Sequence, residues 1–257
     1  MELIDEIKQD RERLKGKPWK EILSHVLEYY KFPLFLLLVA VFGIGSWIYA
    51  RVTTVETALS GILLNSYGYD SVLSEGQRSS FSEDFLEVLG LDSRKYSLSF
   101  RTDLTYCQSG SSAADTYSDY RSLMTIMSCV AADELDFITG DVGAMLGLAY
   151  QGYFIDLSEA LSEEQYKRYC PYFLYIDKVV LEEVNDRTAQ STENTPKIPD
   201  CRKPEMMECP IPVLIDVSQS ETLRGVYLDS YAVLAFGMIA NMPHTGHTLD
   251  FIDYLMP

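Results

Sequence analysis

The segment LDFITGDVGAMLGLAYQ, residues 135 to 151, decides the fold class of this chain. Its first part, Leu135 to Thr139, is a short apolar run of the kind that forms a buried strand. Gly140 and Asp141 interrupt the run, and an apolar stretch of helical length follows to about Gln151. A strand that turns directly into a helix is the repeating unit of α/β proteins.

Segments on both sides of this unit continue the alternation. Strands are predicted at 57–64, 96–102, 212–217 and 232–239, and helices at 81–89, 120–132, 158–169 and 248–255. Gly90 is expected to end the first of these helices, and Ser162 to cap a turn within the third. We therefore predict an α/β domain with a mostly parallel sheet, flanking helices and right-handed crossovers.

Residues 32 to 50, FPLFLLLVAVFGIGSWIYA, contain no charge, and Lys31 and Arg51 stand on either side. A helix of this length is roughly 28 Å long, which matches the hydrocarbon core of a bilayer. The run therefore predicts a single transmembrane helix that acts as an uncleaved signal anchor. A cleaved signal and a buried helix are the alternatives, and the long polar leader and the missing A-x-A site argue against cleavage.

Charge is distributed unevenly about the apolar run. Residues 1–31 carry seven basic and seven acidic residues, so the net charge of −17 comes from the part that follows. Beyond Arg51, basic residues are absent for about 25 residues, which predicts a cytoplasmic N-terminus and an extracytoplasmic C-terminal domain. An acidic exported domain argues against nucleic acid and against anionic lipid as a direct partner. The bilayer itself is the partner of residues 32–50.

Three domains follow from these features. Residues 1–31 are predicted to be a cytoplasmic helical leader, 32–50 the transmembrane helix, and 51–257 the extracytoplasmic domain. Within the last, 186–210 is polar and proline-rich and predicts a mobile loop. All five cysteines lie in the exported part, where disulfides are permitted, and Cys201 with Cys209 is the predicted pair.

The stretch from Asp119 to Leu161 resembles the type II solute-binding proteins of bacterial ABC importers. The resemblance rests on the phrases AADELD, TGD and GYFIDL, and on AFGMIANMPHTGHTLDFIDYL, residues 235 to 255, which is similar to that family's terminal strand, turn and helix. The front end, EYYKFPLFLLLVAVF, is similar to small membrane-anchored relatives. The resemblance implies a periplasmic-binding-protein-like fold, and the length of residues 51–257 implies that its second lobe is reduced.

In open α/β sheets, ligands bind beyond the carboxyl ends of the strands, where helices begin. Polar side chains and backbone amides at these ends suit a small polar solute. The candidate ligand-binding residues are Asn65, Ser66, Tyr67, Thr102, Asp103, Tyr106, Thr139, Gly140, Asp141 and Asn241. The competing interpretations are helix capping for Asp141, a turn for Asn241, and a surface aromatic for Tyr67.

Catalysis finds little support in the sequence. The chain has no G-x-S-x-G, P-loop, G-x-G-x-x-G or C-x-x-C motif, so no cofactor is predicted. His244 and His247 lie in a turn flanked by proline and glycine. We interpret them as residues of a solvent-exposed turn rather than as metal ligands. We therefore expect a protein that is not an enzyme and holds no metal.

Two functions are compatible with these observations. The first is a membrane-anchored, extracytoplasmic bacterial protein of solute-binding type that binds a small polar solute or serves an ABC-type transporter. The second is an envelope interaction or scaffold subunit whose α/β domain contacts a permease or another membrane protein. A binder needs a cleft where the strand-end residues converge, whereas a scaffold fills that cleft and exposes an apolar patch.

Overall fold

The computed structural model describes residues 18–19, 31–53, 55–66, 83–106, 113–187, 197–224, 226–227 and 233–256. The chain divides into two compact units, Met1–Thr54 and Val55–Pro257. The predicted leader helix lies almost wholly outside the described residues, as do Tyr67 and Cys107.

The described part of the first unit is dominated by one helix, α3 (Lys31–Thr53), which contains the apolar run. Large apolar side chains are exposed all along it, including Phe35, Phe42 and Ile48. No helix among the described residues has the combination of length and apolar character needed to cross a membrane.

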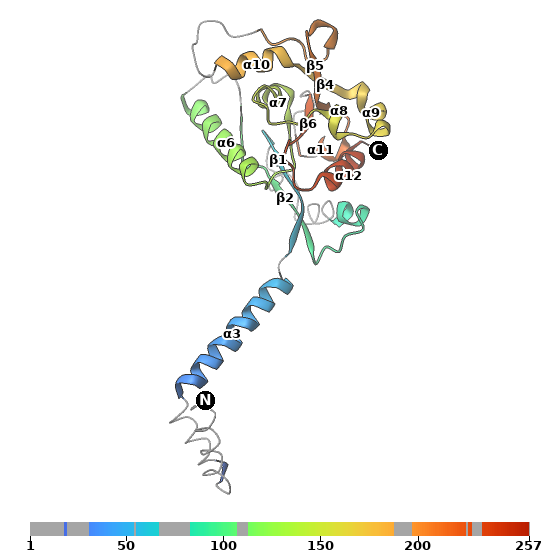
Figure 1. Ribbon diagram of the computed structural model, residues 1–257. Coiled ribbons are helices and arrows are strands. Elements are labelled where there is room, and N and C mark those ends of the chain that lie inside the picture. The colour runs from blue at the N-terminus through green and yellow to red at the C-terminus, as the bar shows by residue number, and fades with distance from the viewer. Residues whose placement is uncertain are drawn as a thin grey trace. The chain divides into compact units, whose positions relative to one another are not determined.

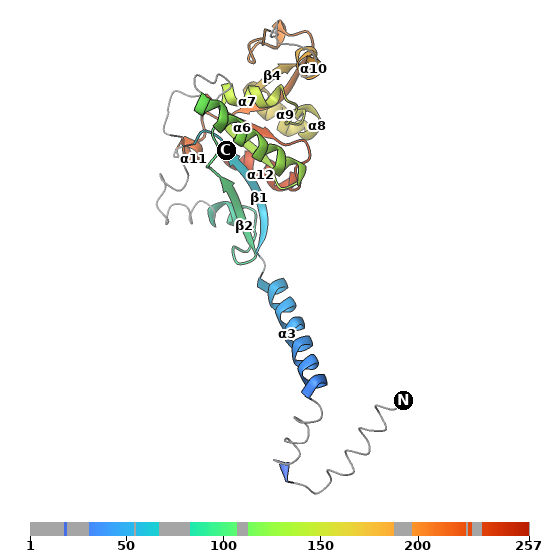
Figure 2. The same cartoon turned by 90° about the vertical axis from the view of Figure 1, so that its left-hand side faces the viewer.

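The second unit is built on one six-stranded sheet with the strand order β2-β1-β3-β6-β5-β4 (Figures 1 and 2). The strands are β1 (Glu56–Leu63), β2 (Tyr96–Arg101), β3 (Phe137–Asp141), β4 (Phe173–Asp177), β5 (Pro210–Asp216) and β6 (Leu234–Met238). All six strands belong to this sheet, so the described ranges show no second lobe with a sheet of its own. The predicted α/β class is confirmed.

Strand direction differs between the two halves of the sheet. β1 runs parallel to both β2 and β3, whereas the pairs β3–β6, β6–β5 and β5–β4 are antiparallel. The sheet is therefore mixed, and the prediction of a mostly parallel sheet is wrong for its C-terminal half. Apolar alternation identifies a strand but carries no information on its direction, which depends on long-range pairing.

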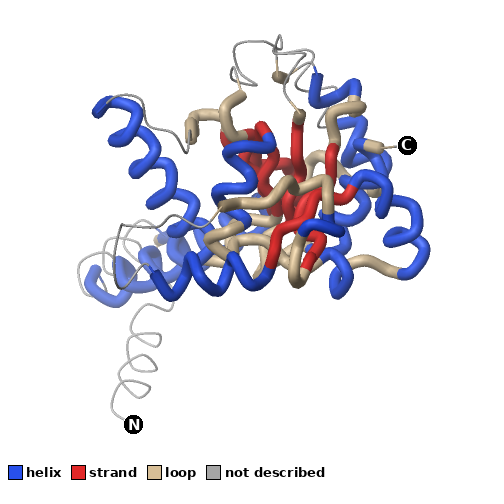
Figure 3. The backbone as a smooth tube through the Cα atoms, turned by 90° about the horizontal axis from the view of Figure 1, so that it is seen from above, coloured by secondary structure: helices blue, strands red, loops and turns tan. Residues whose placement is uncertain are grey.

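Helices cover both faces of the sheet, as Figure 3 shows. They are α6 (Ala113–Ala131), α7 (Val142–Ala149), α8 (Leu157–Ala160), α9 (Glu163–Tyr169), α10 (Lys178–Arg187), α11 (Glu221–Arg224) and α12 (Thr245–Leu255), with a helical segment at 83–88 and the short 3₁₀ turns η1 (Cys170–Tyr172) and η2 (Pro204–Met206). Alternate residues of each central strand enter different cores, which gives a three-layer α/β/α domain.

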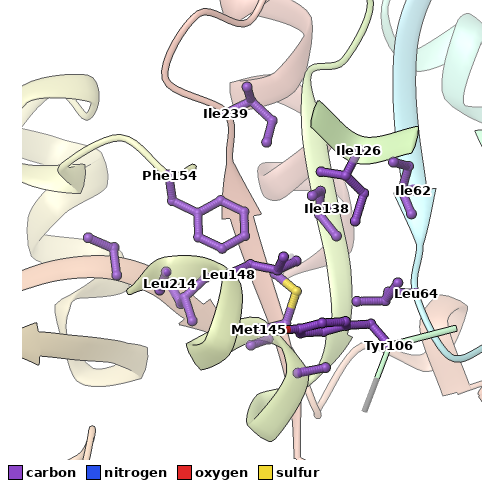
Figure 4. Close-up of a cluster of buried hydrophobic side chains, with 14 of the residues drawn as sticks. Ile62, Leu64, Tyr106, Ile126, Ile138, Met145, Leu148, Phe154, Leu214 and Ile239 are labelled. Atoms are coloured by element: carbon purple, nitrogen blue, oxygen red, sulfur yellow. The ribbon is translucent and has the colours of Figure 1, made fainter. Parts of the chain in front are cut away.

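One core lies between the sheet and α6, α7 and α10 (Figure 4). Ile62 and Ile138 of the sheet meet Ile126 of α6 and Met145 of α7 there. The other core is rich in aromatic side chains and lies under α8, α9, α11, α12 and the 83–88 helix. There the Phe137 ring stacks on the Phe236 ring, with 4.9 Å between their centroids. Because Phe137 fills the space above β1, a Cβ at Gly61 would come within 2.2 Å of its ring.

Local signals of helix ends proved accurate. Gly90 has a φ of +66°, and Leu91 N–H donates to the Leu86 carbonyl at 2.8 Å, which completes the expected glycine cap. The predicted helix at 158–169 is split into α8 and α9 at Ser162, whose side chain and that of Gln165 form a capping box. Asp141 caps α7. Each signal is local in sequence, so it needs no knowledge of the tertiary fold.

The sequence interpretation of residues 170 to 210 was incomplete. β4 and α10 were not predicted, and residues 197–209, assigned to a mobile loop, pack against β4 instead. The Cys201 carbonyl accepts from Tyr175 N–H at 2.8 Å, and the Cys209 carbonyl accepts from Lys178 N–H at 2.9 Å. The second half of the predicted loop is therefore part of the folded domain.

The predicted Cys201–Cys209 disulfide is not formed, because both cysteines are free thiols. Cys201 is buried against β4 while Cys209 is exposed near the end of that strand.

Candidate functional site

Asn65, which directly follows β1, organises the carboxyl edge of the parallel strands. Its Nδ2 donates to the Tyr106 carbonyl at 2.8 Å and to Asp141 Oδ2 at 2.6 Å, while its Oδ1 accepts from Tyr106 N–H at 2.8 Å. Asn65 has a φ of +58°, a conformation that asparagine tolerates better than most residues. One amide side chain therefore joins the ends of β1 and β3 to the segment after β2.

Both carboxylate oxygens of Asp141 accept hydrogen bonds within this cluster. Its Oδ2 accepts from Asn65, and its Oδ1 accepts from Ala144 N–H at 3.0 Å, as an N-cap of α7. Gly140 allows the close approach of β1, because a Cβ there would lie 3.1 Å from the Leu64 Cβ. The capping interpretation of Asp141 is confirmed.

Thr139 is held from the opposite side by Tyr227. The Tyr227 hydroxyl donates to the Thr139 carbonyl at 2.9 Å and lies 3.1 Å from Thr139 Oγ1. Burial raises the pKa of Tyr227 well above its usual range, so the hydroxyl keeps its proton. Burial also raises the pKa of Tyr106, whose hydroxyl accepts from Gln151 Nε2 at 3.3 Å.

Other candidates at this edge are placed differently. Asp103 is exposed and pairs with Arg101 at 3.2 Å, and this hydrogen bond lowers the pKa of Asp103. Thr102 is half-buried beside it, and Tyr67 lies outside the described residues. Ser66 is the exception, because its Oγ is buried and makes no hydrogen bond with the residues that the structure describes.

The predicted strand-end site thus exists as a cluster but not as an open cleft among the described residues. Asn65, Tyr106, Thr139 and Asp141 lie together as expected, but their side chains already bond to one another, to backbone groups, or to Tyr227 and Gln151. The cavity described below is lined by other residues. The cluster joins the ends of β1 and β3 to the start of α7.

Asn241 does not join this cluster. β6 is antiparallel to β3, so the residues that follow β6 emerge at the opposite edge, where β1 and β3 begin. There Asn241 Nδ2 donates to the Val130 carbonyl at 2.8 Å and to the Asp133 carboxylate. The turn interpretation of Asn241 is confirmed, and its assignment to the predicted ligand site is corrected.

A buried carboxylate, Asp136, lies at this amino edge and was not singled out from the sequence. Its side chain has no exposed surface, and it accepts from Ser60 N–H at 2.7 Å and from His244 N–H at 2.8 Å. It also contacts His244 Nδ1 at 3.0 Å. The signal was available, because an acidic residue stands inside the apolar run LDFIT.

Asp136 fixes the orientation of the His244 ring. Because a carboxylate only accepts, the shared hydrogen lies on Nδ1, and in the neutral ring Nε2 carries a lone pair. The His247 ring stacks at 6.2 Å from that of His244, and its Nδ1 lies 2.8 Å from the Ala58 carbonyl. His244 remains one-third exposed, so one edge of this oriented ring is accessible.

His244 lines a cavity of about 610 Å³ that lies along β1 and β2, beside the turn that precedes β3. The cavity is also lined by the hydroxyl-bearing residues Thr57, Ser60 and Ser99 and by the acidic residues Glu56, Asp133 and Glu134. Arg101 contributes its guanidinium, which is bound to Asp103 and lies 3.9 Å from the Cys129 sulfur. No three metal-type ligands converge in the part of the chain that the structure describes.

A second surface feature lies on α6. Its buried residues, Ser122 and Ile126, face the sheet, and an opposite stripe is apolar and exposed. We call this feature the α6 stripe, and it consists of Tyr117, Tyr120, Met124 and Met127. The spacing of three, four and three residues places all of them along one side of the helix.

Comparison of this chain with protein families, characterised proteins and solved structures finds no match. The geometry of the sheet edges and of α6 therefore carries the functional argument.

Proposed function

We propose that the protein is a membrane-anchored interaction subunit whose extracytoplasmic α/β domain contacts another protein of the same membrane through the α6 stripe. The stripe is the observation that carries the proposal. Tyr117 is 73% exposed and Tyr120 is 62% exposed, and two methionines continue the same side of the helix. An apolar row on the solvent side of a helix is a common docking surface for a partner helix.

The proposed anchor is the uncharged run at residues 32–50, and the proposal rests on the sequence. These 19 residues lie in one continuous helix with exposed apolar side chains, and basic residues concentrate before the run. Bilayer insertion removes those side chains from water, and positive-inside orientation places the acidic domain outside the cytoplasm.

The partner we propose presents an apolar helix face and is not a second copy of this chain. The part of the chain after residue 50 carries the whole net charge of −17, so two copies repel one another at close range. Four side chains form a small contact, which predicts weak affinity in solution. Confinement in one membrane raises the effective concentration of both proteins and offsets this weakness.

Photocrosslinking in native membranes tests this role. A photoreactive residue at Met124 should give one discrete adduct with another membrane protein, whereas the same group at Glu164, exposed on α9, should not. Purified adduct partner should bind the full chain, and Met124→Glu should weaken that binding by about tenfold or more. Adducts to a second copy, or equal adducts from both positions, contradict the proposal.

The exposed thiols test the orientation. Cys170 and Cys209 are both exposed, so a membrane-impermeant maleimide should label them in intact cells. Labelling that requires cell lysis contradicts an extracytoplasmic domain. Extraction of the chain by alkaline carbonate contradicts the anchor itself, because an inserted helix resists this treatment.

A second role, binding of a small polar solute, is favoured by a separate observation. The cavity at the amino edge contains a histidine whose orientation is fixed by a buried carboxylate. Thermal-shift screening of the chain against amino acids, peptides, sugars and oxyanions tests it. A ligand at 100 times its dissociation constant adds about 2.7 kcal/mol of stability. Absence of any shift across the panel contradicts this role.

A further inference from the structure

The amino-edge cavity has the chemistry of a cation site. We propose that it binds a small organic ligand with primary ammonium groups, one of which donates to His244 Nε2. The proposal rests on the solute-binding role and names the ligand class for it. It requires neither the anchor nor the α6 stripe.

The first support is the fixed acceptor. Asp136 is fully buried and accepts from the backbone N–H of His244, and the ring cannot turn without losing its own contact with Asp136 at Nδ1. In its neutral form, with the hydrogen on Nδ1, the ring offers a ligand an acceptor and no donor at Nε2. An ammonium or hydroxyl group satisfies this atom, whereas a carboxylate or phosphate does not.

The second support is the charge of the wall. Glu56 and Glu134 line the cavity, and no hydrogen bond or ion pair involving their side chains occurs within the described residues. Arg101, the cation of the wall, has its charge balanced by Asp103 at 3.2 Å. The field in the cavity is therefore negative, which favours an ammonium over a neutral alcohol and disfavours an anion.

The third support is the supply of further acceptors. Thr57, Ser60 and Ser99, whose side chains end in hydroxyl groups, line the same cavity. An ammonium group has three donors, so a ligand that leaves water needs several acceptors around it. Carboxylate, imidazole and hydroxyl together meet that need.

Cys129 supplies a reporter, because it lines the cavity while Cys170 and Cys209 do not. The full chain in detergent is alkylated with N-ethylmaleimide in the presence of putrescine, 1,4-butanediol or succinate at matched ionic strength. These probes share a four-carbon backbone and differ in charge. Putrescine should slow alkylation of Cys129 in proportion to its occupancy and leave the rate at Cys170 unchanged.

Two variants connect the protection to the proposed atoms. Glu134→Gln removes a charge from an exposed residue, and it should weaken putrescine protection by about tenfold. His244→Ala should weaken it to a similar extent, and Glu134→Gln supports the conclusion if that variant fails to fold. Equal protection by succinate or butanediol, equal slowing at Cys170, or protection that survives both variants overturns the ammonium assignment.

The outcome also separates this proposal from the broader role. If putrescine fails to protect Cys129 but another solute from the thermal-shift panel does, the ligand class is wrong and the solute-binding role stands. If no solute protects Cys129, both are wrong.

Discussion

The two edges of the sheet differ in how their buried polar side chains are arranged. At the carboxyl edge, Asn65 and Asp141 bind each other and the backbone around them, which leaves a closed cluster. At the amino edge, Asp136 is equally well satisfied, but it holds His244 beside an open cavity. The difference arises from β6, because its antiparallel direction brings residues 239–244 to the amino edge. The direction of β6 therefore decides that His244 lies beside this cavity.

The largest effect is expected for Asp136→Ala. This change leaves the Ser60 N–H, the His244 N–H and His244 Nδ1 without their buried acceptor. Loss of a buried, fully bonded carboxylate should lower the free energy of unfolding by about 3 kcal/mol or more. Urea unfolding of residues 55–257, which form their own compact unit, measures the change by far-UV circular dichroism. A loss below about 1 kcal/mol would show that this edge does not depend on Asp136.

Asn65→Ala tests the closed edge and should have the next largest effect. It removes the bonds to Tyr106 and Asp141 and forces alanine to adopt a positive φ, for a loss of about 2–3 kcal/mol. Asn65→Gly is the matched control, because glycine tolerates the backbone and loses only the side-chain bonds. Glycine should recover about 1 kcal/mol relative to alanine in the same unfolding measurement. Equal losses would mean that the backbone conformation contributes nothing.

Asn65 and Asp136 also show which features of the two edges can be predicted from the sequence and which cannot. Asn65 and Asp141 were identified because each follows a predicted strand, and such a position depends only on local pattern. Asn241 was assigned to the wrong edge because its position depends on the pairing of β3 with β6, about 100 residues away. Asp136 was marked locally, as an acid inside an apolar run, but its partner His244 is equally distant in the sequence. The missed strand β4 and the absent Cys201–Cys209 bridge have the same origin, since the packing of 197–209 is long-range. Helix caps and strand positions depend on the local sequence, whereas the direction of a strand and its neighbours in the sheet do not.

A second buried acid, Asp177, gives a pH dependence that extends the comparison. It ends β4, which has the direction of β6, so it also lies at the amino edge. Burial alone would raise its pKa, but N–H groups of Glu208, Cys209 and Val179 outweigh that effect and lower the pKa below 3.8. Its stabilisation is therefore complete well above pH 3.8 and is lost as the pH falls through the lower folded-state value.

Asp177→Asn should consequently flatten the acid limb of stability against pH. The measurement is the difference in unfolding free energy between wild type and variant, from neutral pH down to about pH 3. The difference should shrink on acidification, because the wild type loses what the variant never had. A difference that is constant with pH would contradict the depressed pKa.

The smallest effect is expected for Ser66→Ala at the closed edge. Its hydroxyl is buried and lacks a partner among the described residues, in contrast to the bonded side chains of Asn65 and Asp141 beside it. Removing a buried hydroxyl that makes no hydrogen bond should leave the unfolding free energy within about 0.5 kcal/mol of wild type, or raise it slightly. A loss near 1.5 kcal/mol would instead show that the hydroxyl is bonded in the folded protein, so that the carboxyl edge would be closed at Ser66 as well.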